Sequence, residues 1–141
     1  MEKTIICLYG PANCGKTNSI RNLFLKIGGD KNVLNGKPDF VSTVNFGNKI
    51  IGFASQGDPG STQKDDIEEL AKCNPDIIVT ASRSRGGTVN NVTEIANTYG
   101  YTVVWISPFY FYDNTQATEK QYSYFDERNT ECIMKYIIDI I

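Results

Sequence analysis

The residues best suited to chemistry lie near the beginning of the chain, between an apolar run and an amphipathic segment. Residues 10–17 have the sequence Gly-Pro-Ala-Asn-Cys-Gly-Lys-Thr. The two glycines permit backbone angles that turn successive N–H groups toward one point, which makes a concave anion-binding turn. A helix beginning near Lys16 would direct its free N–H groups and the positive end of its dipole at the same point. Residues 10–17 therefore predict an anion-binding loop.

This segment matches G-x-x-x-x-G-K-[ST] at every fixed position, with a strand expected directly before it and a helix directly after it. It therefore resembles the Walker A loop of the P-loop NTPases. The resemblance implies that Lys16 bridges the β- and γ-phosphates of a nucleoside triphosphate, as a catalytic group, and that the Thr17 hydroxyl binds Mg²⁺. Cys14 is expected to be a spacer that contributes its N–H rather than a nucleophile. The residues expected to bind the nucleotide are Gly10, Pro11, Ala12, Asn13, Cys14, Gly15, Lys16, Thr17 and Asn18.

A P-loop protein normally also has an acidic residue at the end of a later strand, which holds the water shell of the metal. Asp58 is the candidate, because open α/β sheets bind ligands beyond the carboxyl ends of their strands. The alternative is that Asp-Pro-Gly forms an ordinary surface turn. The acidic pair in which the ASCE-type ATPases resemble one another is missing here.

The base of the nucleotide is less well defined by the sequence. Two strand-like runs before Asp58 resemble the second and third strands of GTPases, which carry D-x-x-G at this location. Here Asp58-Pro59-Gly60 is one residue short of that motif, and no N-K-x-D motif is present. ATP is therefore the expected nucleotide, with GTP left open.

Two arginines, Arg83 and Arg85, follow another apolar run, at residues 76–81. Small-molecule kinases resemble this arrangement, with arginines on a short lid, and the resemblance implies that either arginine neutralises the transferring phosphoryl oxygens. The alternative is two solvated arginines on a loop of glycine and serine. The sequence does not distinguish Arg83 from Arg85.

Aromatic residues are concentrated in residues 107–125. In kinase-like P-loop proteins this loop borders the base, so Phe109, Tyr110 or Tyr112 would stack on it. The favoured alternative is that the aromatic side chains cover a sheet edge or form a subunit contact.

Composition excludes several other classes of protein. The net charge is −2 and no basic patch stands out, so nothing indicates nucleic-acid binding. No apolar run approaches the length of a membrane span, and no signal peptide is expected. The chain has no histidine, which excludes Ser-His and Cys-His hydrolase mechanisms and a Cys-His zinc site. Four widely spaced cysteines favour reduced thiols and a cytoplasmic location.

Alternating strand and helix patterns predict one three-layer α/β domain over residues 1–141. The resemblance of residues 10–17 to a Walker A loop implies that this domain is a P-loop NTPase-like sandwich. Its sheet of about five strands is expected to be mostly parallel, with one antiparallel edge strand from a hairpin around Gly47-Asn48. The expected strands are residues 3–9, 40–46, 49–55, 76–81 and 101–106. The expected helices are residues 16–27, a segment from about 62 to before Pro75, residues 88–99, and a final helix from about Thr118 or Asp126. Residues 30–39 are expected to form a loop.

The leading functional expectation is Mg²⁺-dependent binding and hydrolysis of ATP, assisted by Lys16 and an arginine. The first alternative is a small-molecule kinase that transfers the γ-phosphate. The second alternative is a nucleotide-dependent switch or assembly protein. In that case residues 107–125 or the C-terminal helix would contact a second copy of the chain or another protein.

Overall fold

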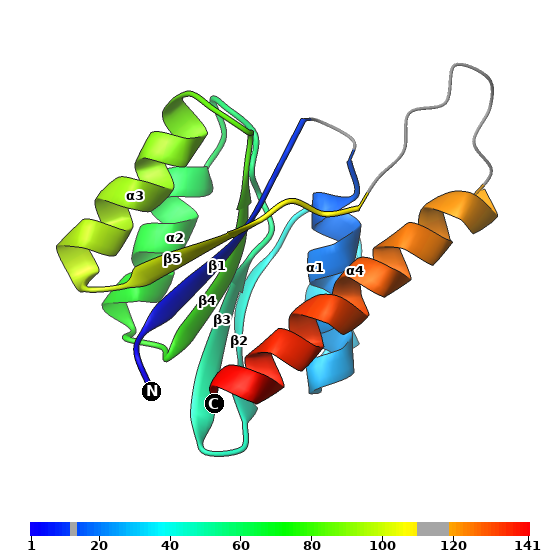
Figure 1. Ribbon diagram of the computed structural model, residues 1–141, viewed down its shortest axis with the longest axis horizontal. Helices are drawn as coiled ribbons and strands as arrows, with labels where there is room; N and C mark the ends of the chain where they lie inside the picture. The colour runs from blue at the N-terminus through cyan, green and yellow to red at the C-terminus, as the bar shows by residue number, and fades with distance from the viewer. Residues whose placement is uncertain (12–13, 110–118) are drawn as a thin grey trace.

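The computed structural model describes residues 1–11, 14–109 and 119–141 (Figure 1). Within these residues, five strands form one sheet in the order β2-β3-β4-β1-β5. The strands are β1 (Thr4–Tyr9), β2 (Val41–Phe46), β3 (Lys49–Ala54), β4 (Ile77–Ser82) and β5 (Thr102–Ile106). The helices are α1 (Lys16–Ile27), the short 3₁₀ helix η1 (Lys31–Leu34), α2 (Gln63–Lys72), α3 (Gly87–Tyr99) and α4 (Glu119–Ile140).

The sheet is mixed and mostly parallel, as predicted. Strands β3, β4, β1 and β5 run parallel to one another, and β2 pairs antiparallel with β3 at one edge. β4 lies between β1 and β3, so the strand that precedes the glycine loop and the strand that precedes Asp58 are not neighbours. The sequence analysis did not give this order.

The hairpin between β2 and β3 forms at the predicted position. Phe46 pairs with Lys49, which leaves Gly47 and Asn48 as a two-residue link. Gly47 has φ 64°, whereas Asn48 keeps a negative φ. A positive φ at the first linking residue alone is the feature of a type II′ turn, which glycine adopts without steric cost.

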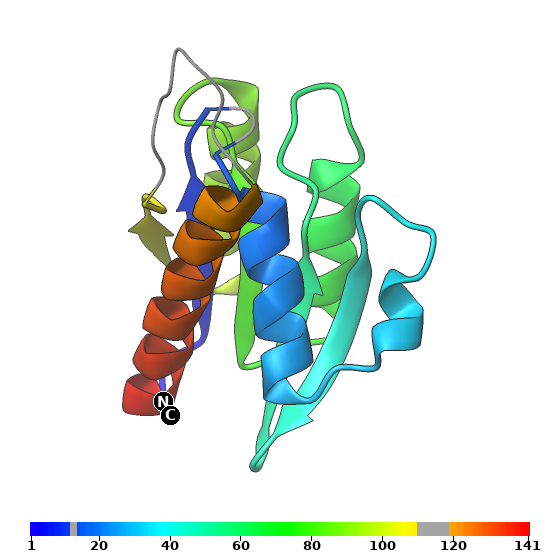
Figure 2. The same cartoon turned by 90° about the vertical axis from the view of Figure 1, so that its right-hand side faces the viewer.

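Helices cover both faces of the sheet (Figures 1 and 2). α1 and α4 lie side by side on one face, and α2 and α3 lie together on the other. Each helix buries an apolar stripe at helical spacing, which is the source of most helical stability in proteins. The buried side chains on these stripes include Ile20, Leu23 and Phe24 on α1, Ile133 and Ile137 on α4, Ile67 and Leu70 on α2, and Val92 and Ile95 on α3.

Two segments differ from the sequence prediction. The expected loop at 30–39 contains η1, because the Asp30 side chain accepts a hydrogen bond from Asn32 N at 2.9 Å and Leu34 is buried. α4 already includes residue 119, so the alternative that the last helix begins at Asp126 is wrong. Asp126 is buried within the helix, and Thr118 lies outside the described residues.

The ends of the parallel strands define where a ligand would bind. In Figure 1 the connections that follow β1, β3 and β4 lie along the same edge of the sheet. This is the edge at which open α/β sheets form ligand sites. None of the helices described here is long and apolar enough to cross a bilayer.

Candidate functional site

The loop after β1 leads directly into the N-terminus of α1. Gly15 has φ 86°, a left-handed conformation that residues with a side chain rarely adopt, and the helix begins at Lys16. The N–H of Ser19 donates to Gly15 O at 3.0 Å. The N–H groups of Lys16, Thr17 and Asn18 precede that bond and have no acceptor within the helix. The first turn of α1 carries no acidic residue of its own, and the carboxylate that reaches the positive end of its dipole belongs to Asp126 of α4.

Lys16 is held against the loop. Its side chain is 7% exposed, and Nζ donates to Gly10 O at 2.6 Å and to Pro11 O at 3.0 Å. Burial is the main cause that lowers the pKa of Lys16, and the charge of Arg83 acts in the same direction. An ammonium has three donors, so one remains for a further acceptor even in this arrangement.

Cys14 is buried within the loop, with its Sγ against Gly10. Burial raises the pKa of the Cys14 thiol, although the charge of Lys16 opposes the shift. A thiol whose pKa is raised carries little thiolate near neutral pH, so this environment disfavours a nucleophilic role. The Cys14 side chain also packs against Gly10, a contact that the expected spacer role did not include.

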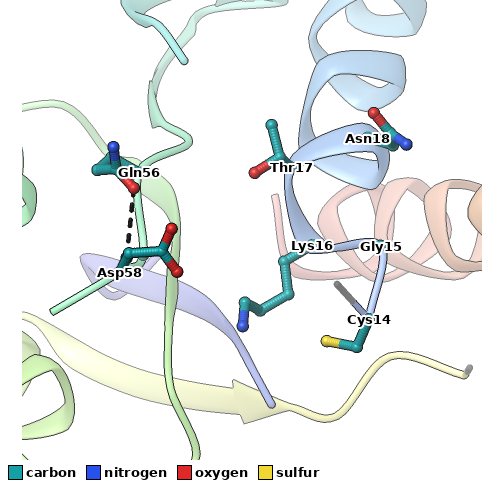
Figure 3. Close-up of a pocket in the computed structure, with 8 residues that line it drawn as sticks. Cys14, Gly15, Lys16, Thr17, Asn18, Gln56 and Asp58 are labelled. Carbon is teal, nitrogen blue, oxygen red and sulfur yellow. Dashed lines mark hydrogen bonds between the residues drawn. The ribbon is translucent and has the colours of Figure 1, made fainter. Parts of the chain in front are cut away.

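A pocket of about 280 Å³ lies beside this loop. Figure 3 shows Lys16 and Thr17 on one side of it, with Gln56 and Asp58 facing them from the segment after β3. Thr17 points into the space between the two sides, whereas Asn18 points away. The structure therefore brings five of the nine predicted nucleotide-binding residues and the predicted metal acid to one pocket. The lining residues are Cys14, Gly15, Lys16, Thr17, Asn18, Gln56, Gly57 and Asp58.

Asp58 is paired with Arg83. Arg83 donates to Asp58 Oδ1 from Nη2 at 3.0 Å and from Nε at 3.2 Å. The Asp58 side chain is 58% exposed and that of Arg83 is 34% exposed. The structure distinguishes the two arginines that the sequence left equivalent, because Arg85 is exposed and forms no ion pair with any described residue.

The surface-turn alternative for Asp58 also has support. Its N–H donates to Gln56 Oε1 at 3.3 Å, and its carbonyl accepts from Ser61 Oγ at 2.5 Å. Backbone groups of Asp58 make these turn contacts, so the turn does not use the carboxylate, which pairs with Arg83. The turn and the metal-binding hypothesis are therefore compatible.

The donor types at the pocket suit Mg²⁺ but do not form a complete cage. Thr17 and Asp58 supply hard oxygen atoms, which Mg²⁺ prefers. No cluster of three or more His, Cys, Asp or Glu side chains exists among the described residues. Mg²⁺ is commonly held by one or two protein oxygens together with phosphates and water, so this donor set fits a metal that arrives with a nucleotide.

A buried glutamine that the sequence analysis missed positions the loop carrying Arg83. Gln63 Nε2 donates to Ala81 O at 3.1 Å and to Thr88 O at 3.0 Å. Its Oε1 accepts from Asn91 Nδ2 at 3.0 Å, and Thr88 Oγ1 accepts from Arg83 N at 3.0 Å. These bonds join α2, the end of β4 and the start of α3. No local sequence signal identifies Gln63, because its partners are up to 28 residues away.

α4 also reaches the glycine loop, which the sequence analysis did not predict. Asp126 is 8% exposed, and its Oδ2 accepts from Asn18 Nδ2 at 3.3 Å. Its Oδ1 occupies the space where a side chain at Gly15 would lie. Burial raises the pKa of Asp126, and the Asn18 hydrogen bond partly offsets that rise. The Asn18 side chain is thus used by α4, and its backbone N–H is the part left for an anion.

Of the aromatic residues considered for base stacking, Phe109 lies in the described part of the chain. Asn129 on α4 accepts from Phe109 N and donates to Phe109 O, both at 2.8 Å. The side chain of Phe109 is 72% exposed. Tyr110 and Tyr112 lie outside the described residues, as do Ala12 and Asn13 of the loop.

Comparison with known proteins adds no identification: no family model, curated protein or solved structure matches this chain.

Proposed function

We propose that this chain binds a nucleoside triphosphate with Mg²⁺ and hydrolyses its terminal phosphoanhydride bond, as a P-loop NTPase-like three-layer domain. ATP is the first candidate, and GTP is left open. One observation carries the proposal: the open N-terminus of α1, with Lys16 and Thr17, faces Asp58 and its partner Arg83 across one pocket.

Binding would rest on the backbone and on Lys16. The free N–H groups at the start of α1 would donate to phosphate oxygens, where the helix dipole favours negative charge. Lys16 Nζ would exchange its contacts with the loop carbonyls for phosphate oxygens, which are charged and therefore stronger acceptors. Burial lowers the pKa of Lys16, and an anionic ligand in contact with Nζ would favour its charged form.

Thr17 and Asp58 are the residues proposed to hold Mg²⁺, directly or through its water. The ion would supply charge neutralisation on the phosphate oxygens. For Asp58 to take this role, the Arg83–Asp58 ion pair must open. Both side chains are partly exposed, and such pairs contribute about 0–1 kcal/mol, so opening costs little.

Arg83 would then move its guanidinium to the terminal phosphate, for which its planar donors are well suited. We therefore assign the catalytic arginine to Arg83 rather than Arg85. Because Gln63 and Thr88 fix the backbone of this loop, the guanidinium can change partners while the main chain stays in place.

No histidine exists in the chain, and Asp58 is the carboxylate that lines the pocket among the described residues. Gln56 lines the same pocket opposite Thr17. Its amide can orient a water molecule by hydrogen bonds but cannot take up a proton at neutral pH. The proposed rate enhancement therefore comes from positioning and electrostatic stabilisation rather than from a strong general base.

Phosphate release from Mg-ATP and Mg-GTP, measured alongside direct binding of each nucleotide, tests the proposal. Saturable release that requires Mg²⁺ is the expected result. ADP formation that rises sharply only when a small acceptor molecule is added, without a matching rise in free phosphate, would favour the kinase alternative instead. Tight binding without release would favour the switch or assembly alternative, and no binding of either nucleotide would refute the proposal.

A further inference from the structure

A second pocket of about 500 Å³ lies between α1 and α4. Figures 1 and 2 show the two helices against each other on one face of the sheet. The polar and charged side chains that line it include Asn18, Asn22 and Lys26 from α1 and Ser123, Asp126 and Glu127 from α4. We name it the α1–α4 groove. It shares Asn18 with the phosphate pocket, so the two spaces adjoin at the start of α1.

Asp126 is the unusual member of this groove. Its carboxylate is nearly buried, yet from the described residues it accepts one hydrogen bond, from Asn18 at 3.3 Å. An ionised carboxylate has about four acceptor positions, and a buried one is costly unless donors fill them. Gly15, on the other side of the carboxylate, presents no side chain that could donate. A ligand with hydrogen-bond donors would therefore be favoured at this position.

The position of the groove relative to the phosphate pocket indicates which part of a nucleotide would reach it. Thr17, Asp58 and Arg83 mark the end of the pocket where metal and terminal phosphate belong under the proposed function. Asn18 points away from that end, toward α4 (Figure 3). A nucleoside triphosphate with its terminal phosphate at that end, and with its phosphates along the free N–H groups of α1, would extend past Asn18. Its nucleoside would then lie near Asp126, which bonds the Asn18 side chain.

We infer that the mouth of the α1–α4 groove is the nucleoside-binding part of the site, in which the Asp126 carboxylate accepts hydrogen bonds from donor groups of the nucleoside. This inference rests on the proposed function. The donors available in a purine nucleotide are the ribose hydroxyl groups, the N–H edge of guanine and the exocyclic amino group of adenine. All three present the same chemistry to a carboxylate, and ligand variants distinguish them.

The test compares a nucleotide with inorganic tripolyphosphate, which has the phosphates but no nucleoside. Calorimetry with Mg-ATP, Mg-GTP, Mg-2′,3′-dideoxy-ATP and Mg-tripolyphosphate would be carried out on the native chain, on Asp126→Asn and on Asp139→Asn. The control removes the same charge from an exposed position of α4 outside the groove. For each protein variant, the nucleotide Kd is divided by the tripolyphosphate Kd. This ratio removes the general effect that the loss of one negative charge has on the binding of any phosphate ligand.

The expected result is that Asp126→Asn lowers the preference for a nucleotide over tripolyphosphate by about tenfold, the usual effect of a hydrogen bond to a charged group. Asp139→Asn should leave this preference unchanged. If the ribose is the donor, dideoxy-ATP should bind the native chain about tenfold more weakly than ATP. If guanine is the donor, GTP should bind more tightly than ATP and lose more on the substitution. If the adenine amino group is the donor, ATP should bind more tightly than GTP and lose more.

The inference is overturned if the preference for a nucleotide over tripolyphosphate is the same in Asp126→Asn and in the native chain. It is also overturned, without any variant, if the native chain binds all four ligands equally. That second result would leave the phosphate pocket and the proposed function intact. A native chain that binds neither nucleotide nor tripolyphosphate would instead refute the proposed function itself.

Discussion

At the scale of single residues, the charged side chains of the site form hydrogen bonds and an ion pair with other groups of the protein in this structure. Lys16 donates to loop carbonyls, and Arg83 donates to Asp58. A phosphate ligand would offer both cations better acceptors and would leave Asp58 to the metal. Three substitutions separate these roles.

Lys16→Ala is expected to weaken binding of Mg-triphosphate by about tenfold to a hundredfold, because a hydrogen-bonded charge contact of about 1.5–3 kcal/mol is lost. Calorimetry with the nucleotide measures this change. Lys135→Ala, which removes an exposed lysine of α4, is the matched control and should bind as the native chain does. Unchanged affinity in Lys16→Ala would contradict the phosphate role of this residue.

Arg83→Ala is expected to lower kcat for phosphate release by about a hundredfold or more, the usual loss when one charge-stabilising donor is removed. Arg85→Ala serves as the control, because Arg85 lies on the same loop but does not contact Asp58. Steady-state kinetics of Arg83→Ala and Arg85→Ala would show which arginine contributes to kcat. Equal loss in the two variants would show that the loop contributes general charge and that Arg83 has no special position.

Asp58→Asn is expected to shift the Mg²⁺ titration of phosphate release to higher concentration, because the amide is a weaker ligand for a hard cation. Asp65→Asn, an exposed carboxylate in the first turn of α2, is the control. A titration curve identical to that of the native chain would place the metal-binding acid elsewhere.

At the scale of elements, α4 and the glycine loop are joined by contacts that neither segment could form alone. Asp126 lies against Gly15 and bonds Asn18, and Thr130 Oγ1 donates to Ser19 O at 3.2 Å. The first turn of α1 is therefore fixed from outside by α4. The stability of this junction should depend on residue size at Gly15 and on the protonation of Asp126.

Gly15→Ala is expected to lower the free energy of unfolding more than Gly36→Ala does. Both glycines have positive φ, so both substitutions introduce strain of about 1–2 kcal/mol. A side chain at Gly36 would meet nothing within 4 Å, whereas one at Gly15 would meet the Asp126 carboxylate. Denaturant unfolding measures both losses, and equal losses would mean that the α4 contact adds no constraint.

The pH dependence of stability should report Asp126. Burial raises its pKa above the usual 3.8, so the folded state binds its proton more tightly than the unfolded state does. The resulting stability is fully present below the unfolded pKa and is lost as pH rises through the folded pKa. The unfolding free energy of the native chain should therefore fall relative to that of Asp126→Asn as pH rises above 3.8. Parallel denaturant titrations at several pH values check this, and a constant difference would contradict it.

At the scale of the whole molecule, the fold leaves surface that remains available to a partner. β5 is an edge strand on which Trp105 is 37% exposed, and the neighbouring Phe109 is more exposed still. On α4, Tyr122, Tyr124 and Ile138 are at least half exposed. Contact with a second copy or another protein through residues 107–125 or the C-terminal helix stays a prediction, and residues 110–118 lie outside the described part. Light scattering with and without Mg-nucleotide would measure any assembly.

The sequence by itself determined the features that depend on neighbouring residues. The glycine loop between a strand and a helix, the Gly47-Asn48 turn and the mostly parallel sheet all follow from backbone preferences and from local apolar periodicity. Such preferences act over a few residues, which is why the candidate loop and the class of fold could be predicted without coordinates.

The tertiary structure alone decided which distant residues meet. It placed β4 between β1 and β3, paired Asp58 with Arg83 rather than with Arg85, and brought Asp126 to Gly15 from more than a hundred positions along the chain. These choices depend on how apolar faces pack and which buried polar groups find partners across the molecule, and no local pattern encodes either. The glycine loop consists of consecutive residues, whereas its surroundings form only once the helices have packed on the sheet.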